Sequence, residues 1–184
     1  MSNRKRRSVN GGKTVMKTFR IPEELDEVLS EAARDNDTSL TEQYVLVLRN
    51  YVRYDRLARK FGFVSLSKST LKALLEALSE EQLREVAASQ SGRVDALSEF
   101  FFKKKDRDSV LGVIDLFSKY GGLFEYTTAL TEGELVVTLR TDLGSKGAFY
   151  LAQFWEPALK SILGPVQKVE IVENQVTFWV KLKN

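Results

Sequence analysis

The chain has 184 residues, enough for one good-sized domain or two small ones, and its 43% hydrophobic and 29% charged residues are ordinary for a globular protein. It contains neither cysteine nor histidine, which excludes disulfides, Cys/His zinc sites, thiolate catalysis and any mechanism that uses an imidazole base. The formal net charge is +3, from 28 basic and 25 acidic side chains.

The sequence favours a cytoplasmic protein without a membrane partner, because no apolar run approaches the roughly 18 residues of a membrane-spanning helix. It also has no GxSxG, Walker, GxGxxG or paired metal-carboxylate motif. The run Gly144–Gly147 looks suited to phosphate but lacks the Walker spacing, so we expect it to begin a helix. We predict no enzymatic activity, no catalytic or metal-ligating residue and no cofactor.

The basic excess lies at the front of the chain. Residues 61–184 hold 15 basic and 16 acidic side chains, whereas residues 1–20 hold seven basic ones and no acidic one: Arg4, Lys5, Arg6, Arg7, Lys13, Lys17 and Arg20. Such a segment is attracted to a polyanion, either nucleic acid or an anionic membrane surface. We predict that residues 1–13 form a flexible basic arm; the alternative is a solvated leader that aids solubility.

A short strand is predicted over residues 15–21, followed by two helices. The strand ends at Pro22, and the acidic residues after this proline are typical of a helix N-terminus. Residues 35–37 break the first helix. A capping box, Ser39–Glu42, then begins a second helix that we expect to continue to about Lys60.

This strand–helix–helix unit predicts a homodimer. A lone strand has no partner within the unit, and about 45 residues cannot build an adequate core by themselves. Two copies solve both problems, because their strands pair as an antiparallel ribbon above interlocked helices. The side chains predicted to form the shared core are Val15, Phe19, Ile21, Val45, Leu48 and Val52.

The order of these motifs resembles the ribbon-helix-helix family. The residues that carry the resemblance are Lys17–Leu25 and Thr38–Glu42, within a stretch of about residues 14–55. Members of that family are obligate dimers that bind DNA, mostly as transcriptional repressors or antitoxins. The chain departs from many relatives in having no glycine between the helices, where Asn36 or Asp37 can adopt the left-handed conformation instead.

The resemblance implies that the ribbon enters the major groove of double-stranded DNA. The outward residues that would read bases are Met16, Thr18 and Arg20, and a guanidinium can pair with O6 and N7 of guanine. The residues that would contact phosphates are Arg4, Lys5, Arg6, Arg7, Lys13, Lys17, Ser39, Leu40 and Thr41, the last three because a helix N-terminus binds anions.

Three alternatives stay open for this part of the chain. Residues 15–21 can instead form an edge of a C-terminal sheet, with Arg20 merely solvated. The protein can be antitoxin-like or a scaffold whose C-terminal domain binds a protein partner. It can also be an architectural protein that binds DNA with little sequence preference.

The rest of the chain predicts an α+β fold, an antiparallel sheet covered by helices. Helices are expected to follow Ser67 and Ser79 and to cover about residues 94–102, 110–120 and 145–163. Two hairpins are expected, one turning at residues 131–134 and one at Glu173–Asn174. The whole chain is therefore divided into the arm (1–13), the ribbon-helix-helix domain (14–62), a helical connector (63–108) and an α+β domain (109–184).

The stretch Leu139–Gly147 and the aromatic helix after it, within about residues 110–183, are loosely similar to small-ligand domains of the 4-vinyl-reductase type, although the Cys and His residues of some relatives are missing here. That resemblance implies a pocket beneath a helix that crosses a sheet, and with it a possible small-molecule effector. The many aromatic residues of this half are explained mainly by core packing, with a ligand cavity or an oligomer surface as alternatives. We expect Trp179 to be the most exposed aromatic ring, and the run 103–108 to be a solvated loop or a second DNA contact.

Overall fold

The computed structural model describes residues 14–131 and 133–182. It divides into two compact units, one ending at Arg49 and one beginning at Asn50, which we treat separately. The division falls inside the stretch 14–62 that the sequence assigned to one domain. Five of the residues that were predicted to contact phosphates lie outside the described residues. They are Arg4, Lys5, Arg6, Arg7 and Lys13.

The first unit contains two helices, α1 (Glu23–Asp35) and α2 (Leu40–Asn50). Residues 14–22, where a strand was predicted, have no regular secondary structure in the single chain. A strand is assigned by its hydrogen bonds to a neighbour, and the described part of one chain offers this segment none. Both helices begin where their start signals predicted.

The turn between α1 and α2 uses Asp37 in place of a glycine. Its φ of +50° is in the left-handed region, as predicted for Asn36 or Asp37. The Thr38 amide donates to the Ala33 carbonyl at 2.9 Å and so closes the end of α1. The predicted capping box is confirmed: the Glu42 amide donates to Ser39 Oγ at 3.2 Å and the Ser39 amide to Glu42 Oε2 at 3.0 Å.

Helical backbone continues from α2 through a π-helical turn, η1 (Tyr51–Asp55), into α3 (Arg56–Lys60). The predicted helix to about Lys60 is therefore confirmed, although the π turn was not expected. Gly62, with φ +82°, follows its end.

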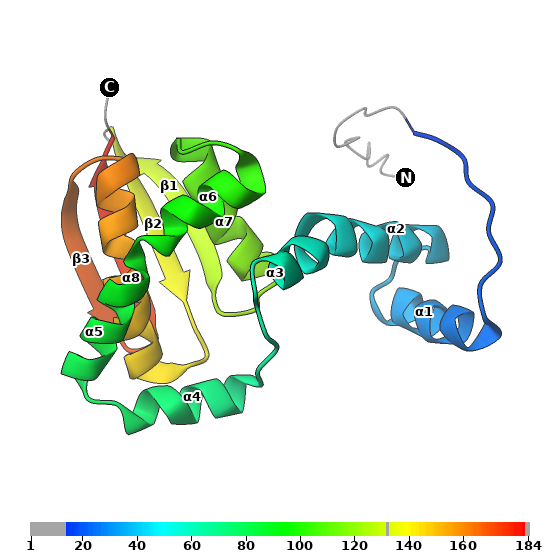
Figure 1. The fold of residues 1–184 in the computed structure, drawn as a ribbon, viewed down its shortest axis with the longest axis horizontal. Coiled ribbons are helices and arrows are strands. Elements are labelled where there is room, and N and C mark those ends of the chain that lie inside the picture. Colours follow the sequence, from blue (N-terminus) through cyan, green and yellow to red (C-terminus); the bar gives the residue numbers. More distant parts are fainter. Residues whose placement is uncertain (1–13, 132, 183–184) are drawn as a thin grey trace, which may run out of the picture. The chain divides into compact units, whose positions relative to one another are not determined.

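The second unit is built on a four-stranded antiparallel sheet of order β1-β2-β4-β3 (Figure 1). Its strands are β1 (Glu125–Thr131), β2 (Glu134–Arg140), β3 (Val166–Val172) and β4 (Gln175–Lys181). Both predicted hairpins are confirmed. Residues 15–21 are not among the strands of this sheet.

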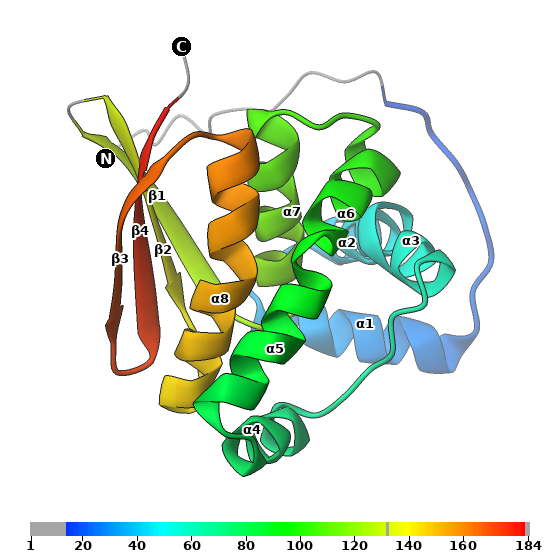
Figure 2. The same cartoon turned by 60° about the vertical axis from the view of Figure 1, so that its left-hand side comes forward.

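Five further helices pack on one another and on the sheet: α4 (Lys68–Ala77), α5 (Glu80–Ser91), α6 (Arg93–Phe102), α7 (Arg107–Lys119) and α8 (Gly144–Ile162). Figure 2 shows α8 against one face of the sheet, with α5 on the far side of α8. The mixed α+β architecture is thus confirmed, with helices covering one face of an antiparallel sheet. Pro157 lies inside α8, where a kink was predicted, and the helix continues through it to Ile162.

The core of this unit lies between the sheet and its helices. Trp155 of α8 and Phe178 of β4 are almost completely buried there, together with Val94 and Leu97 of α6. Residues of the predicted connector therefore form part of the core itself. Trp179 faces away from Phe178, as predicted, but it is only partly exposed, and Lys168 Nζ lies 4.7 Å from the centre of its ring.

The run Gly144–Gly147 begins α8, as expected, and Lys146 in this run connects α8 to the end of α4. Its Nζ donates to the Glu76 and Leu78 carbonyls at the end of α4. A cation at this position satisfies carbonyls that a helix C-terminus leaves without intrahelical partners. The lysine that made this run look suited to phosphate therefore ties α8 to α4.

We predict that Gly147→Ala destabilises the second unit. A Cβ at this position would lie 2.4 Å from the buried Leu143 Cβ, so the backbone must shift, at a cost of about 1–3 kcal/mol in the free energy of unfolding. Gly92→Ala is the control, because its Cβ would meet no atom within 4 Å. Urea denaturation followed by circular dichroism measures both; equal midpoints for the two variants would contradict the packing described.

Candidate functional site

The predicted base-reading residues lie on the extended segment 14–22 of the first unit. Met16, Thr18 and Arg20 are all exposed, and Met16 is 94% exposed. Lys17 is exposed as well. Nothing in the described part of the chain covers the side chains that were predicted to face DNA.

Phe19 ties this segment to the helices. Its ring meets that of Tyr44 on α2 edge to face, with 6.1 Å between the ring centres. The Tyr44 hydroxyl in turn donates to Asp26 Oδ1 on α1 at 2.7 Å. This hydrogen bond, with partial burial and the carboxylate charge, raises the pKa of Tyr44 above its ordinary value. The inward direction predicted for Phe19 agrees with this contact.

The first unit leaves most of its apolar side chains in solvent. Ala33 and Gln43 are its only buried side chains in the described chain, and Gln43 Oε1 lacks a hydrogen-bond donor. Of the predicted shared core, Ile21 is half-buried, and the other residues of this unit are exposed: Val15, Phe19, Val45 and Leu48. Val52, the sixth predicted core residue, belongs to the second unit and is also exposed. A unit this short that buries so little is a weak folding unit alone, and an exposed apolar surface of this kind is typical of an interaction surface.

Charge separates the extended segment from the helices behind it. Residues 14–22 hold Lys17 and Arg20 and no acidic side chain, whereas residues 23–49 hold eight acidic side chains and two basic ones. An anionic ligand is therefore attracted to the extended segment and repelled by α1. The lysines of the run 103–108 differ, because Lys104 and Lys105 lie within 4.0 Å of Asp106 and Asp95.

The N-terminus of α2, the predicted phosphate contact, is formed by Ser39, Leu40 and Thr41. Ser39 and Thr41 are exposed, and Leu40 is half-buried. The Glu42 carboxylate already accepts from the Ser39 amide and hydroxyl, at 3.0 and 2.8 Å. A phosphate at this helix end would therefore rely on the Leu40 and Thr41 amides, which lie in the first turn and have no intrahelical acceptor.

The second unit contains a cavity of about 590 Å³ lined mainly by aromatic rings. It lies among η1, the connection between α3 and α4, and helices α6 to α8. The rings in its lining are Tyr54, Phe61, Phe63, Phe117, Tyr120, Phe124, Tyr150, Phe154 and Trp155. Tyr54 and Tyr120 stack at 5.5 Å, and Phe63 stacks on Phe117 at 5.8 Å.

Few polar groups line this cavity. Trp155 is 1% exposed, and its Nε1–H has no acceptor among the described residues. Burial raises the pKa of Tyr150 above its ordinary value, and the positive charge of Arg93 opposes that shift. Burial also raises the pKa of Tyr54, with a further contribution from the Asp55 carboxylate. The side chains of Arg93 and Asp55 belong to the lining.

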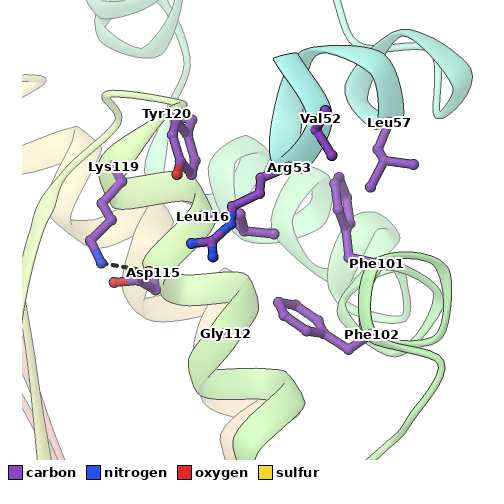
Figure 3. A pocket seen from close by; sticks show the side chains of 10 residues that line it. All are labelled: Val52, Arg53, Leu57, Phe101, Phe102, Gly112, Asp115, Leu116, Lys119 and Tyr120. Carbon is purple, nitrogen blue, oxygen red and sulfur yellow. Dashed lines mark hydrogen bonds and ion pairs between the residues drawn. The ribbon is translucent and has the colours of Figure 1, made fainter. Parts of the chain in front are cut away.

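A smaller cavity of about 360 Å³ lies between η1 and helices α6 and α7 (Figure 3). Val52, a predicted dimer-core residue, points into it beside Phe101. Lys119 pairs with Asp115 at 2.9 Å on its far wall, which leaves Arg53 as a further charged side chain of the lining. Lys119 and Asp115 neutralise each other, so this cavity offers a ligand little uncompensated charge.

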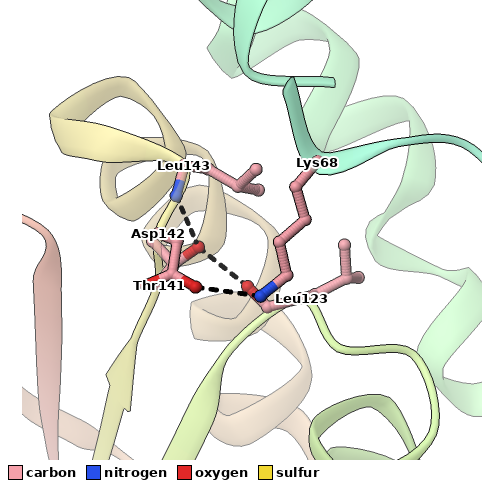
Figure 4. A network of polar contacts seen from close by, with 5 residues as sticks. All are labelled: Lys68, Leu123, Thr141, Asp142 and Leu143. Carbon is pink, nitrogen blue, oxygen red and sulfur yellow. Dashed lines mark hydrogen bonds and ion pairs between the residues drawn. The ribbon is translucent and has the colours of Figure 1, made fainter. Parts of the chain in front are cut away.

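A polar network joins the start of α4 to the end of β2 (Figure 4). Thr141, 1% exposed, donates from Oγ1 to the Leu123 carbonyl at 2.8 Å and accepts from the Leu143 amide at 3.2 Å. The exposed pair Lys68–Asp142 closes at 2.9 Å, and this lysine lowers the pKa of the Asp142 carboxyl. The hydrogen bonds of Thr141 hold the connection between β2 and α8 in place.

In the described residues no group of three or more Asp or Glu is arranged to hold a metal ion, and no helix is long and apolar enough to cross a bilayer. Comparison of the chain with protein-family models, with curated proteins and with solved structures finds no match. Any function must therefore be argued from the chain itself.

Sequence reasoning did not single out the residues of the cavity. The density of aromatic residues was noted, but most were attributed to core packing. Phe61 and Phe63 lie at the predicted boundary between the ribbon-helix-helix domain (14–62) and the helical connector (63–108), and neither was assigned to a cavity. The available signal was an aromatic side chain on each side of Gly62, a pattern more typical of a packed turn than of a solvated linker.

We predict that Thr141→Val lowers the free energy of unfolding by about 2 kcal/mol, because it leaves the Leu123 carbonyl and the Leu143 amide without their partner. Thr128→Val, on the exposed edge strand β1, is the control and is expected to change stability by less than about 0.5 kcal/mol. Denaturant midpoints measure both, and an unchanged midpoint for the Thr141 variant would contradict the network.

Proposed function

We propose that the protein is a homodimeric, sequence-specific DNA-binding regulator that acts in the cytoplasm. One observation carries the proposal: a short helical unit exposes its apolar side chains next to an extended basic segment that pairs with no strand in the described part of the chain. A second copy supplies both missing elements, since the two segments 14–22 can pair as a ribbon over the helices. The order of motifs that resembles the ribbon-helix-helix family points to the same assembly.

In the proposed complex the ribbon lies in the major groove of double-stranded DNA. Arg20 would donate to a guanine edge, Thr18 would offer a hydroxyl and a methyl group, and Met16 would make apolar contact. Lys17 and the amides at the start of α2 would bind phosphates, which position the protein without reading sequence. The acidic face of α1 would stay away from the duplex.

Competition binding distinguishes the proposed regulator from its alternatives. A preferred site is selected from a random-sequence library and then competed with unselected DNA at about 0.15 M salt, because salt weakens phosphate contacts. A regulator keeps its selected site against a large excess of random DNA, whereas an architectural protein loses it. An antitoxin-like or scaffold protein would instead be recovered with one protein partner in fixed stoichiometry.

We predict that Arg20→Ala weakens binding to the selected DNA by about 1–3 kcal/mol and relaxes the base preference at one position. Arg34→Ala, which removes the same charge from the end of α1, is the matched control and is expected to have a much smaller effect. Gel shifts over the selected and randomised sites measure both. Full retention of specificity without Arg20 would contradict the assigned face of the ribbon.

We predict that Leu48→Arg converts the dimer to a monomer and abolishes DNA binding, because Leu48 is 57% exposed in one chain and is assigned to the shared core. Val86→Arg introduces the same charge at a 43% exposed apolar position of α5 and is expected to leave the dimer intact. Sedimentation equilibrium measures the mass of each species. A monomeric wild-type protein would overturn the proposal.

A further inference from the structure

We propose that strand β1 is a second interface of this protein, at which it pairs antiparallel with β1 of another copy of the chain. The interface is separate from the ribbon of residues 14–22 proposed above, because β1 belongs to the second unit. Three features carry the inference: an edge strand without protection, apolar surface that the helices leave uncovered, and an order of side chains that is complementary to itself.

β1 and β3 are the two edge strands of the sheet, and they differ in how open they are to further pairing (Figure 1). In β3 the register shifts between Val166 and Lys168, and Lys168 forms an ion pair with Glu170 at 3.2 Å. Bulges and charged side chains, especially lysine, keep edge strands from pairing with other chains. β1 pairs with β2 over all seven of its residues without a shift, and its sequence, EYTTALT, contains no lysine, arginine or proline. The edge of β1 is therefore open to a further strand.

The helices leave part of the inner face of β1 uncovered. Thr128 and Leu130 lie opposite buried residues of β2, so their side chains are on the face on which the helices pack. Leu130 is nevertheless 65% exposed, and Thr128 is exposed as well. Tyr126, in contrast, is half-buried, and its hydroxyl donates to Asp115 Oδ1 on α7 at 3.2 Å. α7 therefore covers the first part of this face of β1 and not the second.

The order of side chains along β1 is complementary to itself. If Thr128 lies on the two-fold axis, Tyr126 lies opposite Leu130 of the second copy, on the same face of the sheet. The exposed Leu130 of each copy then packs beside the half-buried Tyr126 of the other and loses contact with water. A second copy thus supplies an apolar side chain to each uncovered position, which makes it the occupant that fits this edge.

Charge is compatible with this pairing. Glu125 is the single charged side chain of β1, and Arg140 lies directly opposite it on β2. On its other side Glu125 would face Thr131 of the second copy, so no like charges lie opposite each other across the axis. The two four-stranded sheets would become one continuous antiparallel sheet.

The pairing is expected to be weak. One pair of seven-residue strands buries less surface than the roughly 1,200 Å² of a stable interface, so we expect a Kd of about 10–100 µM. At about 5 µM the ribbon dimer would therefore be the main assembly, and pairing of β1 would add a second step at higher concentration.

The test uses single cysteines in the full chain, which has none of its own. Residues directly opposite each other in antiparallel strands have Cα atoms about 4.5–5.5 Å apart, a distance that a disulfide spans. Thr128→Cys places two thiols face to face, so about 200 µM protein with oxidised glutathione should give a disulfide-linked dimer on a non-reducing gel. Thr131→Cys is the matched control on the same strand. Its two copies would lie about 20 Å apart, so it should cross-link at least about tenfold more slowly.

Two results would overturn the proposal directly: equal cross-linking of the two variants, or none from Thr128→Cys. A third result would assign the edge to a different occupant. If β1 accepts residues 14–22 of another copy, a tagged Thr18→Cys chain would cross-link to Thr128→Cys, while Thr128→Cys alone would not form a dimer.

Charged variants test the same register without a disulfide. Thr128→Lys and Thr128→Glu each place like charges opposite one another and should weaken association about fivefold, whereas an equal mixture of the two should restore it. Val172→Lys, on the other edge strand, is the control and should change nothing. A mixture that associates no better than either variant alone would contradict the proposed pairing.

Sedimentation equilibrium at about 5 to 200 µM measures this association, with Leu48→Arg in every chain to remove the ribbon dimer. The variants at position 128 are compared with one another within that background. The comparison therefore stays valid if Leu48 proves to lie outside any interface, and loss of DNA binding does not affect it. The two proposals thus fail separately.

Discussion

Burial of apolar surface is the constraint on which the rest of the structure depends, and the two units meet it differently. The second unit covers Trp155 and Phe178 almost completely with its own helices and sheet. The first unit covers little more than Ala33 and Gln43, and leaves Val28 and Leu48 62% and 57% exposed. Such surface costs free energy in water, and a second copy of the chain would cover it in the homodimer that we propose. Pairing, not local propensity, is therefore what would turn its extended segment into a strand.

Local signals explain most of what could be predicted from the sequence. The Ser39 and Ser79 capping boxes each satisfy orphan amides at a helix start, and both hairpins turn where glycine or a polar pair allows a positive φ. Residues 15–21 show the limit of this reasoning. Their alternation predicts a strand, but a strand needs a neighbour, and one chain does not supply it. The candidate DNA-binding residues therefore remain a prediction from the sequence.

Contacts between distant parts of the chain explain what the sequence did not reveal. The pattern of Val94 and Leu97 shows an apolar helix face, but not that this face joins the main core, so the segment was predicted to be a connector. Lys146 illustrates the same point, because its acceptors at Glu76 and Leu78 lie about 70 residues away. The aromatic cavity likewise gathers rings from five separate segments. Periodicity reports which face of an element is apolar, not what will cover it.

The π turn changes the direction in which side chains point along the helical run from Leu40 to Lys60. A π turn contains an extra residue, which rotates the following side chains by about 100° around the helix. The apolar stripe with Val45 and Leu48 precedes it, whereas Tyr54, within it, lines the aromatic cavity and Ala58, after it, is buried. The register shift therefore explains why the apolar side chains before the π turn do not continue along the same line after it, so a period of 3.6 residues applied to all of residues 40–60 misplaces the side chains that follow the turn.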